Sequence, residues 1–261
     1  MRSPFILRTV GRIGGKTRAF VAEFGQASKL LGESFSYTRW IPRDRRLLLD
    51  QMAHIGSDSL PLVFVIGFFT GMVSAWQAAY QFKGLIPYSL LGAAVSRAIF
   101  IELGPVLTAI VIAGRVGASI AAELGTMRVT EQIDALESLA ISPARYLALP
   151  RIVAAIVMMP LLVIFANTIA LLGAYLVSNM FLDISSKMFF DSVQRFFHLK
   201  DIFGGLVKAL FFGGVTALIG VHVGMRASGG AEGVGNATIR AFVLSSAMIL
   251  VMDYMLWTIL F

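Results

Sequence analysis

Five long apolar blocks leave this chain few ways to fold. They cover residues 60–80, 90–122, 152–182, 203–224 and 241–261. A helix needs about 20 residues to cross the hydrocarbon core of a bilayer, and each block reaches that length. Hydrophobic residues make up 57% of the chain, more than soluble domains contain. We therefore predict an all-α integral membrane protein with five transmembrane helices, because lipid does not tolerate the unpaired edges of open sheets.

The second and third blocks are longer than a bilayer requires. Each contains one internal proline, Pro105 or Pro160. Because proline removes a backbone hydrogen-bond donor from a helix, we expect the two long spans to bend at these positions.

The basic residues predict which way the helices run. Ten Lys and Arg residues lie in residues 1–59, three in the loop after the second block and two in the loop after the fourth, whereas the opposite loops hold four. Cytoplasmic loops are enriched in Lys and Arg, so the N-terminus is expected in the cytoplasm and Phe261 on the outer side. The chain then divides into a cytoplasmic N-terminal segment, 1–59, and a membrane domain, 60–261.

Two amphipathic stretches flank the spans. Before the first block, apolar residues recur every three or four positions, at Phe20, Phe24, Ala27, Leu31 and Phe35. This spacing predicts a helix that lies in the cytoplasmic interface of the membrane. A soluble helix packed on a partner is the alternative. Between the third and fourth blocks, residues 188–197 are predicted to form a second interfacial helix on the outer side.

Among the ionisable residues inside the apolar blocks, four draw attention: Glu102, Arg115, Lys208 and Asp253. A charge at the bilayer centre costs about 2.5–3.5 kcal/mol, so such residues pair with one another or line hydrated cavities. With about 1.5 Å of rise per residue, all but Arg115 fall in the outer half of the membrane. Lys208 is therefore expected to neutralise one of the two acids. The group either fixes helix register as a structural ion pair or lines a cavity that meets a lipid headgroup. Arg115, near the cytoplasmic end of its span, is expected to snorkel or to bind backbone carbonyls.

A polar segment, 131–139, follows the second block, and Pro143 limits its helix. Acidic residues at intervals of three form one edge of this helix: Glu131, Asp134 and Glu137. Apolar residues form a second edge: Ile133, Leu136 and Leu139. A short charged helix directly below a membrane span suits the cleft of a soluble ATPase that pushes on it. An ordinary solvated loop is the alternative.

The sequence argues against metal, thiol and nucleotide sites on this chain. It has no cysteine, and its three histidines lie far apart. Gly11 and Gly15 enclose three residues, whereas a phosphate loop needs four before its Gly-Lys-Thr. We therefore expect no catalytic residue, no metal and no cofactor here, and ATP with Mg²⁺ on a partner chain.

Several motifs together resemble one known family. They are Glu102-Leu103-Gly104-Pro105, Ala113-Gly114-Arg115-Val116-Gly117-Ala118-Ser119, the run from Glu123 to Glu137, Gly233-Val234-Gly235-Asn236-Ala237-Thr238, Ser245-Ser246 and Asp253. This set is similar to the signature of the MlaE (YrbE-type) permeases, the membrane subunits of MCE-associated ABC lipid transporters. The likeness covers most of the chain from about residue 60 to residue 261.

The resemblance implies an architecture and a set of partners. The fold would be similar to the membrane domains of G-subfamily ABC exporters, with an N-terminal interfacial helix and five spans. The chain would form a homodimer that binds two ATPase subunits and a ring of MCE-domain proteins, expected to be a hexamer. A phospholipid would occupy a central cavity of the dimer.

The resemblance also assigns roles to residues. Glu102, Lys208 and Asp253 match positions that face the lipid cavity. The segment 128–142 matches the coupling helix, whose contacts with the ATPase would be Glu131, Gln132, Ile133, Asp134, Leu136 and Glu137. At Ile101 the chain departs from relatives that carry Arg directly before this glutamate, which makes Lys208 the more important cation.

The function expected from these features is that of a permease subunit in the bacterial inner membrane, with no nucleic-acid partner. It would move phospholipids between that membrane and a periplasmic MCE protein and so maintain lipid asymmetry, powered by the separate ATPase. The alternatives are an intramembrane enzyme and a proton-coupled secondary carrier, either of which would use Glu102 and Asp253. Five spans without an internal repeat argue against the carrier.

Overall fold

The computed structural model describes residues 18, 22–23 and 25–261. Within these residues the chain forms helices and loops and no strand. Five helical runs among them are long and apolar enough to cross a membrane, namely Arg45–Phe82, Tyr88–Val129, Ala144–Phe181, Leu199–Gly224 and Gly230–Leu260. The predicted all-α membrane fold with five spans is therefore confirmed. The glycine-rich segment 11–17, Phe20 and Phe24 lie outside the described residues.

The helical runs consist of shorter elements. In chain order they are η1 (Thr38–Trp40), α2 (Arg45–Ile55), η2 (Ser57–Ser59), α3 (Leu60–Phe82), η3 (Tyr88–Leu90), α4 (Leu91–Ala98), η4 (Ile99–Leu103), α5 (Gly104–Ile112), η5 (Ala113–Gly117), α6 (Ala118–Val129), α7 (Gln132–Ser138), η6 (Ala144–Ala148), α8 (Leu149–Phe181), α9 (Ser186–Arg195), α10 (Leu199–Gly224) and α11 (Gly230–Leu260). The elements η4, η5 and η6 are π-helical turns. Residues 25–36 form a further helix.

The two internal prolines behave differently. Pro105 lies in the first turn of α5, directly after the π turn η4. A π turn changes the hydrogen-bond spacing of the helix, so it accommodates a residue that has no N–H to donate. Pro160 lies inside α8, which continues through it. The second span is therefore interrupted at its proline, whereas the third remains one helix.

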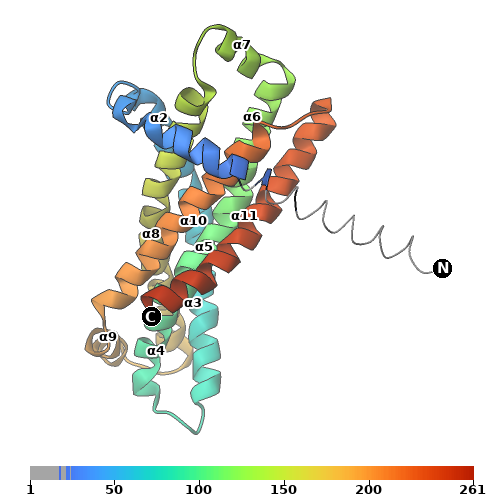
Figure 1. Cartoon of the computed structure of the whole chain (residues 1–261). Helices are drawn as coiled ribbons and strands as arrows, with labels where there is room; N and C mark the ends of the chain where they lie inside the picture. The colour runs from blue at the N-terminus through green and yellow to red at the C-terminus, as the bar shows by residue number, and fades with distance from the viewer. Residues whose placement is uncertain (1–17, 19–21, 24) are drawn as a thin grey trace, which may run out of the picture.

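The bundle has two distinct ends (Figure 1). The short helix α7 lies beyond the spans at one end, and α4 and α9 lie at the other. The C-terminal Phe261 belongs to the α9 end, because its ring lies 5.6 Å from Lys200 Nζ near the start of α10. We refer to these two ends as the α7 end and the α9 end.

Helix α8 forms the centre of the fold, where it packs against α2, α3 and α10. Its contact with α3 is close because small residues face one another. A Cβ atom added to Gly71 of α3 would collide with the backbone carbonyl of Ala170 on α8. Helices α10 and α6 also approach closely, since a Cβ atom added to Gly224 of α10 would lie 3.0 Å from the Cα of Ala121 on α6. The Gly67–Gly71 and Gly220–Gly224 pairs therefore pack helices within one chain, as small residues commonly do in membranes.

Two helices cross the α7 end of the bundle. In the helix 25–36, Leu30 and Leu31 pack against the main core, whereas Phe35 remains 47% exposed. The sequence did not predict α2, which ends at the buried Ile55 and packs on α8. The N-terminal segment is thus attached to the bundle by its own apolar side chains.

The predicted outer interfacial helix is α9. Its N-cap Ser185 accepts a hydrogen bond from the Met188 backbone N–H. Phe189 is 1% exposed and belongs to a hydrophobic cluster with residues of α3, α4 and α8. The Ser192 hydroxyl accepts a hydrogen bond from the Ala93 backbone N–H at 3.0 Å. Helix α9 therefore packs against α4 through one side and exposes Phe190 on another.

Candidate functional site

The ammonium group of Lys208 lies between two carboxylates inside the bundle. It donates a hydrogen bond to Glu102 Oε2 at 2.7 Å and contacts Asp253 Oδ1 at 2.8 Å. The same Nζ atom lies 5.0 Å from the centroid of the Trp257 ring. The Lys208 side chain is fully buried, whereas the Glu102 side chain is 37% and the Asp253 side chain 19% exposed. The cation that was predicted to neutralise one acid therefore contacts both.

Three elements position this charged cluster. Lys208 lies on α10, Glu102 on the π turn η4, and Asp253 on α11. Trp257 follows Asp253 by four residues, so both lie on the same face of α11. Helix α10 reaches η4 because Gly205 has no side chain, since a Cβ atom there would collide with the Phe100 carbonyl oxygen. The close approach brings Lys208, one turn further along α10, within hydrogen-bond distance of Glu102.

The charged cluster lies within apolar membrane spans, so each of its charges is stabilised mainly by the opposite charge beside it. One ammonium and two carboxylates carry a formal charge of −1 when all three are ionised. Breaking a buried ion pair by removing one partner costs about 3–5 kcal/mol, because the remaining charge has no compensation. Glu102 is the most exposed member, so its carboxylate is the most accessible charged group of the cluster.

Glu102 also lines a groove of about 390 Å³ between α3 and the α4–η4 segment. Ser74, Gln77 and Gln81 of α3 and Ala98 lie along the same groove. The amides and the carboxylate offer both donors and acceptors within an otherwise apolar span. A molecule that is polar at one end and apolar elsewhere fits such a lining.

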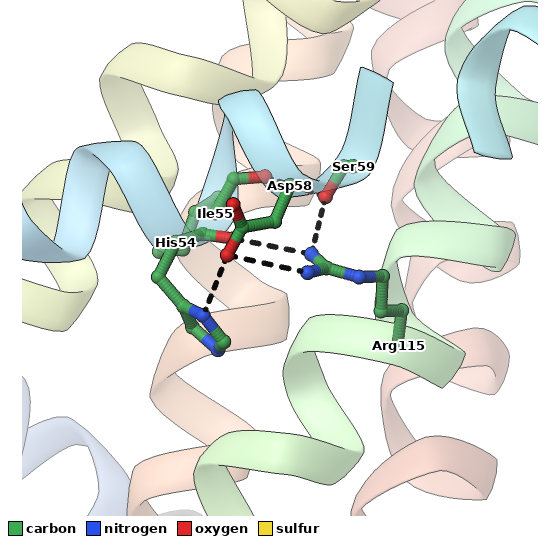
Figure 2. A network of polar contacts seen from close by, with 5 residues as sticks. All are labelled: His54, Ile55, Asp58, Ser59 and Arg115. Carbon is green, nitrogen blue, oxygen red and sulfur yellow. Dashed lines mark hydrogen bonds and ion pairs between the residues drawn. The ribbon is translucent and has the colours of Figure 1, made fainter. Parts of the chain in front are cut away.

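Each π turn carries one ion-pairing side chain: Glu102 on η4, Arg115 on η5 and Arg145 on η6. Figure 2 shows the contacts of Arg115 with the bend between α2 and α3. Arg115 Nη1 donates hydrogen bonds to the His54 carbonyl at 3.1 Å and to Ser59 Oγ at 2.7 Å. Its Nη2 lies 3.7 Å from Asp58 Oδ2, which also contacts His54 Nδ1 at 3.1 Å. The expected binding of a backbone carbonyl is confirmed, and an ion pair accompanies it.

Helix α7 projects from the α7 end on two tight turns. Glu131 and Ala140, which flank the helix, both have positive φ angles, of 60° and 58°. After the helix, the Ile141 N–H donates to the Leu136 carbonyl at 2.9 Å, which satisfies a carbonyl at the helix C-terminus. Arg128 at the end of α6 forms an ion pair with Asp134. The position of α7 is therefore set relative to the second span.

Two further ion pairs tie the start of the third span to its surroundings. Arg145 Nη2 lies 2.9 Å from Asp44 Oδ2, and its guanidinium carbon lies 4.3 Å from the centre of the Trp40 ring. Arg151 is 5% exposed and pairs with Glu123 of α6 at 2.6 Å. Paired charges therefore connect α7 to the second span, the second span to the third, and the third span to the N-terminal segment.

Comparison with known proteins identifies the family. The family model for the permease MlaE matches residues 48–259. The chain belongs to the MlaE permease family. A probable ABC transporter permease protein of Rickettsia felis is 39% identical over 256 residues, which cover 98% of this chain and 99% of the relative. A probable ABC transporter permease protein of Synechocystis sp. is 39% identical over 232 residues, covering 89% and 88% of the two chains.

A plant relative also aligns with this permease. The Arabidopsis thaliana protein TRIGALACTOSYLDIACYLGLYCEROL 1, chloroplastic, is 35% identical over 216 residues, which cover 83% of this chain and 62% of the relative. Together with the family match, these relatives identify the chain as a multi-pass permease subunit of an ABC transporter. Such a subunit takes part in transport and works with partner proteins such as an ATPase.

The structure changes three expectations about α7 of this MlaE-family permease. The helix covers Gln132–Ser138, so Glu131 precedes it and does not continue the acidic stripe. Ile133 is 4% exposed and belongs to the core of the chain. Ile133 therefore anchors α7 and is not available to an ATPase. Leu139 was predicted on the same apolar edge, yet it is 71% exposed, because the helix has already ended before it.

The sequence reasoning missed two polar features of the permease. Arg97 Nε donates a hydrogen bond at 2.9 Å to Asp201 Oδ2, whose side chain is 6% exposed. This pair joins α4 to the first turn of α10, towards the α9 end from Lys208. Gln77 and Gln81 of the groove were also missed. Arg97 and Gln77 inside the apolar blocks, and Gln81 directly after the first block, were the available signals, but a residue type alone does not show which helix its side chain faces.

Proposed function

We propose that this chain is the permease subunit of an ABC transporter that moves phospholipids between the inner membrane and a periplasmic MCE-protein partner. The observation that carries the proposal is the charged cluster of Lys208, Glu102 and Asp253, together with the groove that Glu102 lines. A buried ionisable group inside a membrane span marks a functional site by default. A polar headgroup would meet the cluster while the acyl chains remain against apolar walls.

The name of the Arabidopsis relative refers to a lipid, trigalactosyldiacylglycerol, which supports a lipid as the transported molecule here. Two copies of this chain would form the transport pathway. In support of a homodimer, α11 is the least buried of the five spans among the described residues. It exposes apolar side chains including Val251, Tyr254 and Met255, and a second copy would cover them.

Transport would be driven from the α7 end. The exposed face of α7, with Gln132, Glu137 and neighbouring residues, would fit a cleft of the ATPase. Closure of two ATPase subunits would move α7, and the ion pairs of Arg128 and Arg151 would transmit that movement to the second and third spans. The equilibrium between two arrangements of the dimer would then shift, opening the lipid site to one side or to the other.

Native mass spectrometry of the gently extracted complex tests this assignment. We expect two copies of this chain, two ATPase subunits, six MCE-domain subunits and bound phospholipid. A proton-coupled carrier or an intramembrane enzyme would be recovered without an ATPase. Recovery of the chain alone, under conditions in which a known ABC transporter stays intact, would contradict the proposal.

Orientation in the membrane gives an independent test. Because the chain has no cysteine, single cysteines report accessibility without background labelling. Gln132→Cys lies on α7 and Lys187→Cys on α9, and both positions are exposed. In cells with a permeabilised outer membrane, we expect a membrane-impermeant maleimide to label position 187 and to reach position 132 only after the inner membrane is opened. The reverse pattern would place α7 on the periplasmic side, where no ATPase could use it.

A further inference from the structure

A small polar pocket lies at the α7 end, far from the charged cluster of Lys208. It has a volume of about 230 Å³ and lies between the end of α10, the start of α11 and the N-terminal segment. Its polar lining includes Glu23, His222, Arg226, Asn236 and Arg240. His222 follows Lys208 by 14 residues on α10, so the two sites are roughly 21 Å apart along that helix.

Two polar groups in this pocket have no partner among the described residues. Arg226 forms no ion pair with any other described residue, whereas Arg240 is paired with Glu23. The Nε2 atom of His222 is buried and has no hydrogen-bond partner within the described part of the chain. Buried polar atoms are nearly always hydrogen-bonded, so the unpartnered His222 Nε2 beside the exposed, unpaired guanidinium of Arg226 points to a ligand that completes the site.

The charge of the pocket selects an anion. Two guanidinium groups and one carboxylate leave a formal charge of +1, with His222 neutral. Guanidinium groups donate paired N–H bonds to phosphate oxygens, and Asn236 adds an amide donor. The first turn of α11 contributes the positive end of its helix dipole. Glu23 opposes an anion, but its charge is already compensated by Arg240.

Apolar side chains surround the same donors. Val223 and Leu244 line the pocket itself. An adjoining cavity of about 160 Å³ shares His222 and Arg226 and is bordered by Leu30 and Met225. A phosphate group attached to an acyl-bearing molecule would satisfy both surroundings, with the phosphate on the arginines and apolar atoms against Leu30.

We propose that this pocket binds the phosphate group of an anionic phospholipid at the membrane surface, at a site separate from the transport pathway. The proposal does not depend on the transported molecule, since none of the five polar residues belongs to the charged cluster. A bound phosphate would link α10, α11 and the N-terminal segment, and so hold together three elements at the end that contacts the ATPase.

Calorimetric titration of the purified full chain in detergent tests the site with three probes. They are dioctanoyl phosphatidylglycerol, inorganic phosphate, and dioctanoylglycerol, which lacks the phosphate. We expect Arg226→Gln to weaken phosphatidylglycerol binding about tenfold or more, since a hydrogen bond to a charged group is lost. Arg226→Lys should recover part of the affinity, because lysine keeps the positive charge but lacks the paired N–H donors of the guanidinium group. Dioctanoylglycerol should bind equally weakly to all variants.

The controls separate this pocket from other sources of binding. Arg46→Gln removes an exposed charge on α2 outside the pocket, and it should leave the affinity within twofold of the parent. Only the binding that is lost in Arg226→Gln is assigned to this pocket, so lipid bound near the charged cluster of Lys208 is not counted. If inorganic phosphate binds as tightly as the lipid, the site recognises free phosphate and the assignment to a lipid is overturned. Equal losses in the Arg46 and Arg226 variants would mean general surface attraction and would overturn the site itself.

Discussion

Replacing Lys208 with methionine should both destabilise the protein and abolish transport. The substitution leaves Glu102 and Asp253 facing one another without the ammonium group that lies within 2.8 Å of both. Glu102 is partly exposed and is able to regain water, whereas Asp253 is largely buried. A buried charge that loses its partner costs about 3–5 kcal/mol, which is a large part of the stability of a typical domain. Denaturant titration in detergent would measure the loss.

A compensated variant separates stability from function. In Lys208→Met combined with Glu102→Gln and Asp253→Asn, all three charges are removed together, so no unpaired charge remains. Replacing a complete buried ion cluster with uncharged residues of similar volume avoids the cost of an unpaired charge, and with apolar residues it is often neutral or stabilising. We expect this triple variant to regain most of the lost stability while lipid transfer from reconstituted vesicles stays absent. Normal transfer in the triple variant would mean that the cluster only holds the helices together.

Reversing the charge of Glu137 should release the ATPase. Glu137 is exposed on α7 and forms no ion pair with another described residue, so Glu137→Lys should leave the fold of this chain intact. Asp134 is less suitable, because it pairs with Arg128 and its loss would disturb α7 itself. Breaking a desolvated charge contact at an interface costs about 2–5 kcal/mol, which corresponds to a loss of affinity of about thirtyfold or more.

Co-purification of the ATPase with tagged permease measures this effect. Asp191→Lys is the matched control, because it makes the same kind of charge reversal on an exposed residue of α9 at the other end. We expect the control to retain the ATPase and Glu137→Lys to lose at least nine-tenths of it. Full retention by Glu137→Lys would show that the ATPase does not bind this face of α7.

The tertiary structure decided which residues of α7 remain available to a partner. Ile133 and Leu139 share one predicted apolar edge, yet Ile133 is 4% and Leu139 71% exposed. Ile133 lies in the first turn of α7 and packs on the core, whereas Leu139 follows the last helical residue, so the two do not share one continuous helical face. Periodicity in the sequence predicts which residues share a face, but it does not show how far the helix extends or which end of the face is covered.

The amino-acid sequence by itself determined the membrane class, the five spans and the set of ionisable residues within them. These features follow from local composition, since about 20 apolar residues in a row have few stable environments other than a bilayer. Only the tertiary structure decided that Lys208 contacts two carboxylates and that Arg97 forms an ion pair with Asp201. It also decided that each of the three π turns carries one side chain that forms an ion pair with another helix or segment. Such pairs join residues up to 106 positions apart, so they depend on how helices cross, which no local pattern of residues specifies.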